Sequence, residues 1–354
     1  MTADLRPVAI LGGAGFIGAN LASQLARTGR RVRIYDNLSR AGVERNLAWL
    51  RQAHGDRIEA VIADLRDRER LRAAIAGTAA VFHLAGQTAV TTSLADPRAD
   101  FDVNASGTLE VLEALRAQAA PPPLVLASTN KVYGTLHDIY LTSRGERWRP
   151  VDDRLHERGI DERRRVEPRT PYGCSKACAD QYTLDYAHGF GLPAVVFRMS
   201  CIYGPHQLGT EDQGWVAHFL LRARQGLPIT IYGDGQQVRD VLHVDDLVDA
   251  FVRAWRQIDA VRGGVFNIGG GPRNTLSLLE LIDAIAQLSG RRPELRFEDW
   301  RAGDQRYYVS DTAAYTAATG WRPLVAPRAG IEALHAWLAQ DAQDAAPTAG
   351  GAHA

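Results

Sequence analysis

Tyr172 and Lys176 are the residues of this sequence whose types and spacing could do chemistry together. Four residues apart, they would lie one turn apart on the same face of a helix, although the same spacing also occurs on ordinary surface helices. An ammonium held there can favour the phenolate of a tyrosine, whose pKa is ordinarily about 10. Such a pair could move a proton on a sugar or alcohol hydroxyl near neutral pH. The chain has two lysines, Lys131 and Lys176, among its 41 lysines and arginines, so the lysine at 176 is informative.

The elements that must position this pair are a helix and a strand end. The helix would begin at Pro171, since proline is favoured at the first helical position. Ser128 and Thr129 follow the apolar run 124–127, which is interpreted as a buried strand. Polar residues at the carboxyl end of a strand in an open α/β sheet face the ligand crevice. We therefore expect Thr129 to face the same crevice.

A glycine-rich turn follows the first predicted strand, Val8–Leu11. Gly12, Gly15 and Gly18 lie between that strand and a helical pattern over 19–28, which is the context of a dinucleotide-binding loop. The glycines allow a tight turn and let the helix N-terminus approach a pyrophosphate closely.

Acidic residues end the next two predicted strands. Asp36 ends strand 32–35, where its carboxylate would accept hydrogen bonds from the adenosine ribose and repel a 2′-phosphate. This predicts NAD rather than NADP, a preference that Arg40 nearby weakens. Asp64, after strand 58–62, could bond the adenine amino group or cap the next helix.

Residues with small or amide side chains also fit a site for a dinucleotide cofactor. The fourth predicted strand runs into Ala85 and Gly86, which permit close approach of a cofactor. His83, inside that strand, is interpreted as a packed core histidine. Asn104 lies midway along a predicted helix over 96–118, where asparagine is unfavourable, so its amide is expected to have a role.

Alternating strands and helices predict an α/β fold with a doubly wound parallel Rossmann sheet. We assign 1–200 to a dinucleotide-binding domain that also takes in parts of 236–270. A smaller, interwoven, mixed α/β lobe over 201–340 would bind the substrate. Residues 135–170, polar and rich in arginine, are interpreted as a long loop over the site. The Ala-, Gly- and Asp-rich tail 341–354 is expected to be disordered.

Composition limits the class of protein. With 354 residues, 45% hydrophobic and 23% charged, the chain is typical of a soluble globular protein. A formal net charge of zero gives no broad attraction to nucleic acid or anionic membranes. No apolar run reaches membrane-spanning length, and the N-terminus lacks a signal-peptide pattern. Three cysteines without a C-x-x-C pair indicate reduced thiols and no metal site. We expect a cytoplasmic protein.

From about residue 7 to 340 the chain resembles the extended short-chain dehydrogenase/reductase family of nucleotide-sugar epimerases and dehydratases. The resemblance is carried by the glycine loop, Asp36, Asp64-Leu65, His83-Leu-Ala-Gly86, Asn104, Thr129, Tyr172 with Lys176, Arg239-Asp240 and Arg301-Ala-Gly-Asp304. Leu11 departs from the family, which usually has threonine there. That threonine supports the turn and takes no part in the chemistry.

The resemblance implies a tightly bound NAD, regenerated in each turnover, and three catalytic residues. Thr129 would orient the reacting hydroxyl and Tyr172 would move its proton. Lys176 would lower the pKa of Tyr172 and bond the nicotinamide ribose. The implied cofactor contacts are Gly12, Gly15, Phe16, Ile17, Gly18, Asp36, Asn37, Ser39, Arg40, Asp64, Leu65, Leu84, Ala85, Gly86, Thr88, Asn104, Tyr172, Lys176 and Met199.

The resemblance also implies a nucleotide-diphosphate sugar as substrate. Arg239 and Arg301 match the family's positions for the diphosphate, which suits the bidentate geometry of arginine. Asp304 would bond the nucleotide ribose. Lys131 could touch the sugar or a phosphate, or simply fill space, and Trp215 could equally be core. The other implied substrate contacts are Val90, Thr91, Asn130, Cys201, Gln207 and Gln213.

Three stretches resemble, within the family, the 2-epimerases of CDP-linked hexoses: Asp36–Arg40 through Asn46–Trp49, Ser128–Gly134 and Asp212–Trp215. In the family's 4,6-dehydratases two acids follow the threonine, where this chain has Asn130 and Lys131. The resemblance therefore implies an isomerase that inverts C2 of a CDP-linked hexose.

Two alternatives stay open. A C4 epimerase, or one acting on another CDP- or UDP-sugar, would use the same three catalytic residues. A non-catalytic NAD-binding module would keep the fold without the chemistry. Relatives imply a homodimer or homotetramer paired through helices near 97–118 and 171–189, with no nucleic-acid or membrane partner.

Overall fold

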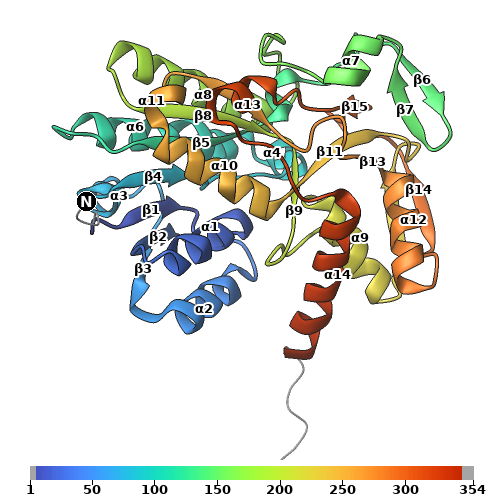
Figure 1. Ribbon diagram of the computed structural model, residues 1–354, viewed down its shortest axis with the longest axis horizontal. Coiled ribbons are helices and arrows are strands. Elements are labelled where there is room, and N and C mark those ends of the chain that lie inside the picture. The colour runs from blue at the N-terminus through green and yellow to red at the C-terminus, as the bar shows by residue number, and fades with distance from the viewer. Residues whose placement is uncertain (1–4, 345–354) are drawn as a thin grey trace, which may run out of the picture.

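The computed structural model describes residues 5–344 and is organised around a seven-stranded, wholly parallel sheet (Figure 1). The strand order is β12-β8-β5-β4-β1-β2-β3. The chain therefore changes its direction of winding between the adjacent strands β1 and β4, and ligands of such sheets bind outside the strands' carboxyl ends there. The predicted doubly wound fold is confirmed. Strand bounds are β1 Val8–Leu11, β2 Val32–Asp36, β3 Ile58–Ile62, β4 Ala80–His83, β5 Leu124–Thr129, β8 Ala194–Met199 and β12 Val265–Ile268.

Helices cover both faces of this sheet, which explains why its central strands β1, β4 and β5 are buried along their whole length. One face packs against α1 (Phe16–Arg27), α2 (Val43–His54) and α10 (Val244–Arg256). The other packs against α3 (Arg68–Ile75), α6 (Gly107–Arg116) and α8 (Pro171–Gly189). The strand expected near 265 returns to the sheet as β12, which pairs with β8.

A smaller lobe lies beside the carboxyl end of the sheet (Figure 1). Its central strand is β11 (Val238–His243), which pairs with β9 (Cys201–Tyr203), β13 (Thr275–Ser277) and β15 (Tyr307–Tyr308). A separate parallel pair joins β10 to β14, and three helices enclose a second apolar core. Their bounds are β10 Ile229–Tyr232, β14 Leu295–Glu298, α9 Trp215–Arg224, α12 Leu278–Ser289 and α14 Pro327–Asp344; α11 Ile258–Val261 and α13 Ala313–Thr319 complete the chain's C-terminal half.

The segment over 135–170 is not simply a long loop. It contains the antiparallel hairpin β6 (Leu141–Arg144) and β7 (Arg147–Pro150), followed by α7 (Asp153–Arg158). The hairpin is anchored to the smaller lobe by Trp148, whose backbone N–H donates to Gln236 O at 2.9 Å and whose indole donates to Asp234 Oδ2 at 2.9 Å. These strands are short and largely polar, so no hydrophobic periodicity marks them in the sequence.

Two other boundaries differ from expectation. The predicted helix over 96–118 consists of α5 (Pro97–Phe101), a π-helical turn η2 (Asp102–Ser106) and α6. Of the tail expected to be disordered from 341, residues 341–344 instead continue α14, and 345–354 lie outside the described residues. The remaining short elements are η1 Gly55–Arg57, α4 Val90–Ala95 and η3 Asn130–Tyr133. Within residues 5–344, no helix combines the length and apolar character needed to cross a membrane.

Candidate active site

The helix α8 places Tyr172 and Lys176 at the carboxyl edge of the sheet. Pro171 is its first residue, and the Thr170 hydroxyl caps it by accepting from Gly173 N at 3.1 Å. Tyr172 and Lys176 are both buried. The local sequence therefore determines where the helix starts, and the start determines which residues face the strand ends.

Thr129 links strand β5 to Tyr172. Its hydroxyl caps the turn η3 by accepting from Lys131 N at 3.2 Å. Burial raises the pKa of Tyr172 to about 12, against a hydrogen bond from Thr129 that lowers it, and Asp100 raises it further. Lys176 is not among the groups that shift the pKa of Tyr172, so the predicted lowering of this pKa by Lys176 is not found.

Lys176 is directed at the backbone of β5. Its Nζ donates to Ala127 O at 2.6 Å. Burial lowers the pKa of Lys176 to about 8, although Asp180 and Asp100 oppose that shift. A Cβ added at Gly86 would lie 2.7 Å from Asn104 Oδ1, so glycine is needed where the Asn104 amide approaches, and the same position is 3.9 Å from Lys176 Nζ.

A buried carboxylate that sequence reasoning missed lies behind the pair. Asp100 accepts hydrogen bonds from Ser175 Oγ, from Asn104 Nδ2 at 3.1 Å and from Gln87 Nε2 at 3.1 Å. Asn104 also donates to Ser175 Oγ and Gln87 O, while its own Oδ1 is buried without a protein partner in the described chain. The Asn104 amide thus joins the π-helical turn to α8 through Ser175, and its predicted contact with the cofactor stays a prediction. The feature of the sequence that could have pointed to this buried cluster is Ser175, a polar residue between Tyr172 and Lys176.

The turn between β1 and α1 has the shape that a dinucleotide needs. Gly12 has φ +81°, and a Cβ there would lie 2.6 Å from Ala85 N. A Cβ at Gly18 would lie 2.3 Å from Gly12 O. Helix α1 begins at Phe16 after Gly15, with no side chain capping its N-terminus. Its first N–H groups can therefore bind a phosphate, and these residues fit a pyrophosphate.

Asp36 and Asp64 lie at neighbouring strand ends beside this turn. The Asp36 carboxylate accepts from Ala14 N at 3.0 Å and Leu38 N at 2.9 Å, and burial raises its pKa. Hydrogen bonds from Arg66 hold the pKa of Asp64 well below its usual range. The capping alternative for Asp64 is wrong, because Asp67 caps α3.

Some of the remaining predicted cofactor residues pack against the two cores, and others are half-buried or exposed. Asn37 donates to Asp64 Oδ2 at 2.9 Å. Leu65 is buried, and Leu84, Ile17 and Met199 pack partly buried against the cores. Ser39 is exposed, while Ala85 and Thr88 are half-buried. His83 is a packed core residue, as expected, with Nε2 3.0 Å from Thr108 Oγ1.

Gln207 and Gln213, which are predicted substrate contacts, lie next to residues predicted to contact the cofactor. They line one small pocket together with Phe16 and Arg40. The Gln207 amide oxygen is buried without a protein partner among the described residues, and its Nε2 donates to Ile202 O at 3.1 Å.

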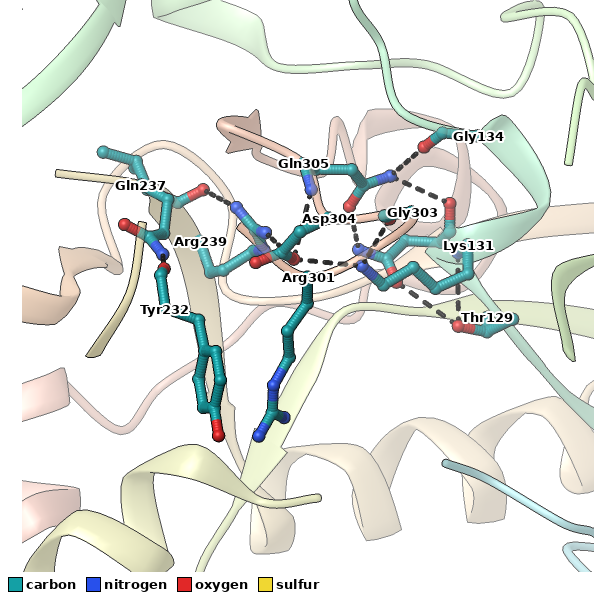
Figure 2. A network of polar contacts seen from close by, with 12 residues as sticks. Thr129, Lys131, Gly134, Tyr232, Gln237, Arg239, Arg301, Gly303, Asp304 and Gln305 are labelled. Carbon is teal, nitrogen blue, oxygen red and sulfur yellow. Dashed lines mark hydrogen bonds and ion pairs between the residues drawn. The ribbon is translucent and has the colours of Figure 1, made fainter. Parts of the chain in front are cut away.

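The loop after β14 meets the turn after Thr129 (Figure 2). Lys131 Nζ donates to Gly303 O at 3.2 Å and lies 3.4 Å from Asp304 Oδ1. Arg239 Nη2 lies 3.0 Å from the same oxygen. Burial raises the pKa of Asp304, but Lys131 and Arg239 outweigh it, and the net shift is downward.

Two further hydrogen bonds join the turn after Thr129 to the loop after β14. Asn130 Nδ2 donates to Gln305 Oε1 at 3.2 Å, and Gln305 Nε2 donates to Gly134 O at 2.7 Å. Gln305 is fully buried, and no pattern in the sequence pointed to it.

Arg301 does not join this cluster. It donates to Glu211 O at 2.9 Å, and its guanidinium lies 3.7 Å from the Tyr232 ring centroid, a cation–π contact (Figure 2). Burial raises the pKa of the Cys201 thiol, while Arg239, Trp215 and Lys131 act to lower it. Val90 begins α4, and the Thr91 hydroxyl is buried without a partner in the described chain.

The arrangement can hold a dinucleotide and a phosphorylated ligand on one crevice and exchange a proton at Tyr172. The described residues contain no group of three or more His, Cys, Asp or Glu side chains able to hold a metal ion.

Comparisons with known proteins agree with this geometry. Residues 8–269 match the model of the NAD dependent epimerase/dehydratase family. The chain is 41% identical to a CDP-paratose 2-epimerase of Salmonella typhi, covering 93% of this chain and 98% of that one. It is 34% identical to a UDP-glucose 4-epimerase of Mycolicibacterium smegmatis, covering 91% and 95%. The crystal structure of the Thermus thermophilus UDP-glucose 4-epimerase in complex with NAD superposes with TM-score 0.78 at 31% identity, covering 94% and 99%.

Proposed function

The chain belongs to the NAD-dependent epimerase/dehydratase family, and on that premise we propose that it inverts C2 of a CDP-linked hexose, converting CDP-paratose to CDP-tyvelose. It is a nucleotide-sugar epimerase, and its cofactor is NAD. The choice of C2 and of CDP rests on the relative from Salmonella typhi, which is 41% identical.

The observation that carries the proposal is the pair of residues after Thr129. Asn130 and Lys131 occupy the positions where elimination of water would need acids, and both side chains are engaged by the 303–305 loop. Epimerisation through a ketone needs a single proton carrier and a returnable hydride, so the site has what that reaction requires.

Bound NAD supplies a hydride acceptor that is regenerated when the hydride returns to the sugar. Gly12, Gly15 and Gly18 would hold its pyrophosphate on α1, and Asp36 its adenosine ribose. Lys176, beside Gly86, would bond the nicotinamide ribose.

Tyr172 removes the proton from the sugar 2-hydroxyl and later returns it. Thr129 orients that hydroxyl, and its hydrogen bond is the contact that favours the phenolate. Between the two steps the flat 2-keto sugar presents its other face. Water must stay out while the ketone exists, which the burial of Tyr172 and Lys176 favours.

The test is proton NMR of the purified enzyme with CDP-paratose, CDP-glucose and UDP-glucose in separate tubes without added cofactor. A changed coupling pattern at H2 for a CDP-sugar, with no NADH accumulating in solution, supports the proposal. Inversion at H4 would favour the C4 alternative, for which the 34% identical UDP-glucose 4-epimerase is the precedent.

Tyr172→Phe separates the enzyme from a binding module. Loss of the phenol removes the proton carrier, so we expect turnover to fall by roughly 10²–10⁴-fold while the NAD content of the protein is unchanged. Unchanged turnover would contradict the assigned role of Tyr172.

We also propose that the chain acts in the cytoplasm as a homodimer or homotetramer paired through the helices at 97–118 and 171–189. Phe101, Tyr182 and Phe190 are large apolar side chains exposed at or next to these helices. Light scattering of the purified protein should give at least twice the 38.7 kDa mass of one chain. A monomer would contradict the proposal.

A further inference from the structure

Lys131 connects the catalytic turn to the smaller lobe. It is two residues after Thr129, and its backbone N–H is held by the Thr129 hydroxyl. Its ammonium reaches a loop 172 residues further along the chain, where it donates to Gly303 O (Figure 2). A displacement of that loop is therefore passed to Thr129 through one short turn.

The contacts of Asp304 are concentrated on one oxygen. Lys131 Nζ, Arg239 Nη2 and Gln305 N all lie within 3.4 Å of Oδ1. No donor in residues 5–344 bonds Oδ2. One carboxylate oxygen thus holds the loop in place, and the other can accept a hydrogen bond from a ligand.

The charges of this cluster do not cancel. Two cations, Lys131 and Arg239, share the single carboxylate of Asp304. Arg239 has a side chain only 8% exposed, and an unbalanced charge so poorly hydrated is costly unless an anion joins it. On the proposed function, the diphosphate of the nucleotide sugar would supply that charge.

The tie between Asn130, Gln305 and Gly134 keeps the two segments in register. Because Gln305 is fully buried and bonded at both ends of its amide, the loop cannot slide along the turn without losing these bonds.

We propose that Lys131 is a positioning residue: through Asp304 it sets the distance between the nucleotide anchor and Thr129, and so which sugar carbon reaches Tyr172. This rests on the proposed function. A sugar attached through its diphosphate has limited reach, so a shift of the anchor changes the carbon presented for oxidation. Misplacement by about 1 Å can cost about 10²-fold in rate.

The experiment is a double-mutant cycle on the NAD-loaded enzyme with Lys131→Met, Asp304→Asn and both together, measuring kcat, KM and the inverted carbon by NMR. We expect Lys131→Met to lower kcat/KM by roughly 10- to 100-fold, with the loss mainly in kcat. In the Asp304→Asn background the same change should have little further effect, because Lys131 acts through Asp304. Arg306→Met is the matched control: it removes an exposed cation two residues from Asp304 that lies against Trp148 and Trp300, and it should leave kcat/KM unchanged.

Additive losses, or a Lys131→Met enzyme with unchanged kcat, would overturn the proposal. Inversion at another carbon by the unaltered enzyme would refute the proposed function, and the cycle measured at that carbon would still decide the role of Lys131. If no sugar is turned over, the same cycle on the affinity for CDP, measured by calorimetry, decides it: coupled losses support the proposal and additive ones reject it.

Discussion

Replacing Asp180 by asparagine should destabilise the protein strongly. Asp180 lies on α8, and Arg198 on β8 bonds its carboxylate through Nε at 2.7 Å and Nη2 at 3.2 Å. The side chains are 0% and 3% exposed. Ser128 Oγ, next to Thr129, lies 3.3 Å from the same carboxylate. Asp180 therefore joins α8, the helix that carries Tyr172 and Lys176, to strands β8 and β5 of the sheet.

The magnitude follows from what Asp180→Asn leaves behind. The amide keeps the shape and one acceptor, but the guanidinium of Arg198 remains charged in a buried site. Two charge-assisted bonds of about 1.5–3 kcal/mol each are weakened, and breaking a buried pair usually costs about 3–5 kcal/mol. We expect a loss of about 3–5 kcal/mol, a large share of the roughly 5–15 kcal/mol that stabilises most folded proteins.

The assay is urea unfolding of the NAD-loaded protein, followed by the fluorescence of its seven tryptophans. The control is Glu332→Gln, which breaks the exposed pair between Arg328 and Glu332 and should cost less than about 1 kcal/mol. Replacing both Asp180 and Arg198 by leucine and methionine should recover much of the loss, since no buried charge is left unpaired. If Asp180→Asn costs no more than the control, the reasoning is refuted.

Three further measurements test the surroundings of the same helix and of the glycine turn. Burial lowers the pKa of Lys176 from 10.5 to about 8, so between these two pH values the unfolded chain binds more protons than the folded one. The free energy of unfolding should therefore rise with pH across that window, by about 3 kcal/mol in total. Urea unfolding of Lys176→Met, measured over the same pH range, should lack this rise. Gly18→Ala puts a methyl group 2.3 Å from Gly12 O, and should sharply lower the NAD content of the protein measured after acid release. Gly189→Ala is the control, because a Cβ at Gly189 would meet no atom within 4 Å and the NAD content should not fall. Equal NAD content in both variants would contradict the turn geometry. Asp100 raises the pKa values of Tyr172 and Lys176, so Asp100→Asn should move the acidic limb of the kcat/KM profile to lower pH, and an unmoved limb would argue against this coupling.

The parts of the site that the sequence predicted are those whose determinants are local. The glycine turn is recognisable because strand, turn and helix are consecutive, and only glycine allows φ +81° at position 12 with a Cβ position 2.6 Å from Ala85 N. The start of α8 is recognisable from Pro171, and a start there puts Tyr172 and Lys176 on one turn. The assignment of individual residues to cofactor and substrate stays a prediction.

Tertiary structure decided everything that depends on residues far apart in the chain. Asp100 meets Ser175 across 75 residues and Lys131 meets Gly303 across 172, and no periodicity links such positions. It also decided the charge states: spacing alone predicts that Lys176 lowers the pKa of Tyr172, but burial raises that pKa to about 12. Spacing along a helix determines which side chains are neighbours, whereas the free energy of a charge depends on how much water and which dipoles surround it, and these are set only when the lobes pack together.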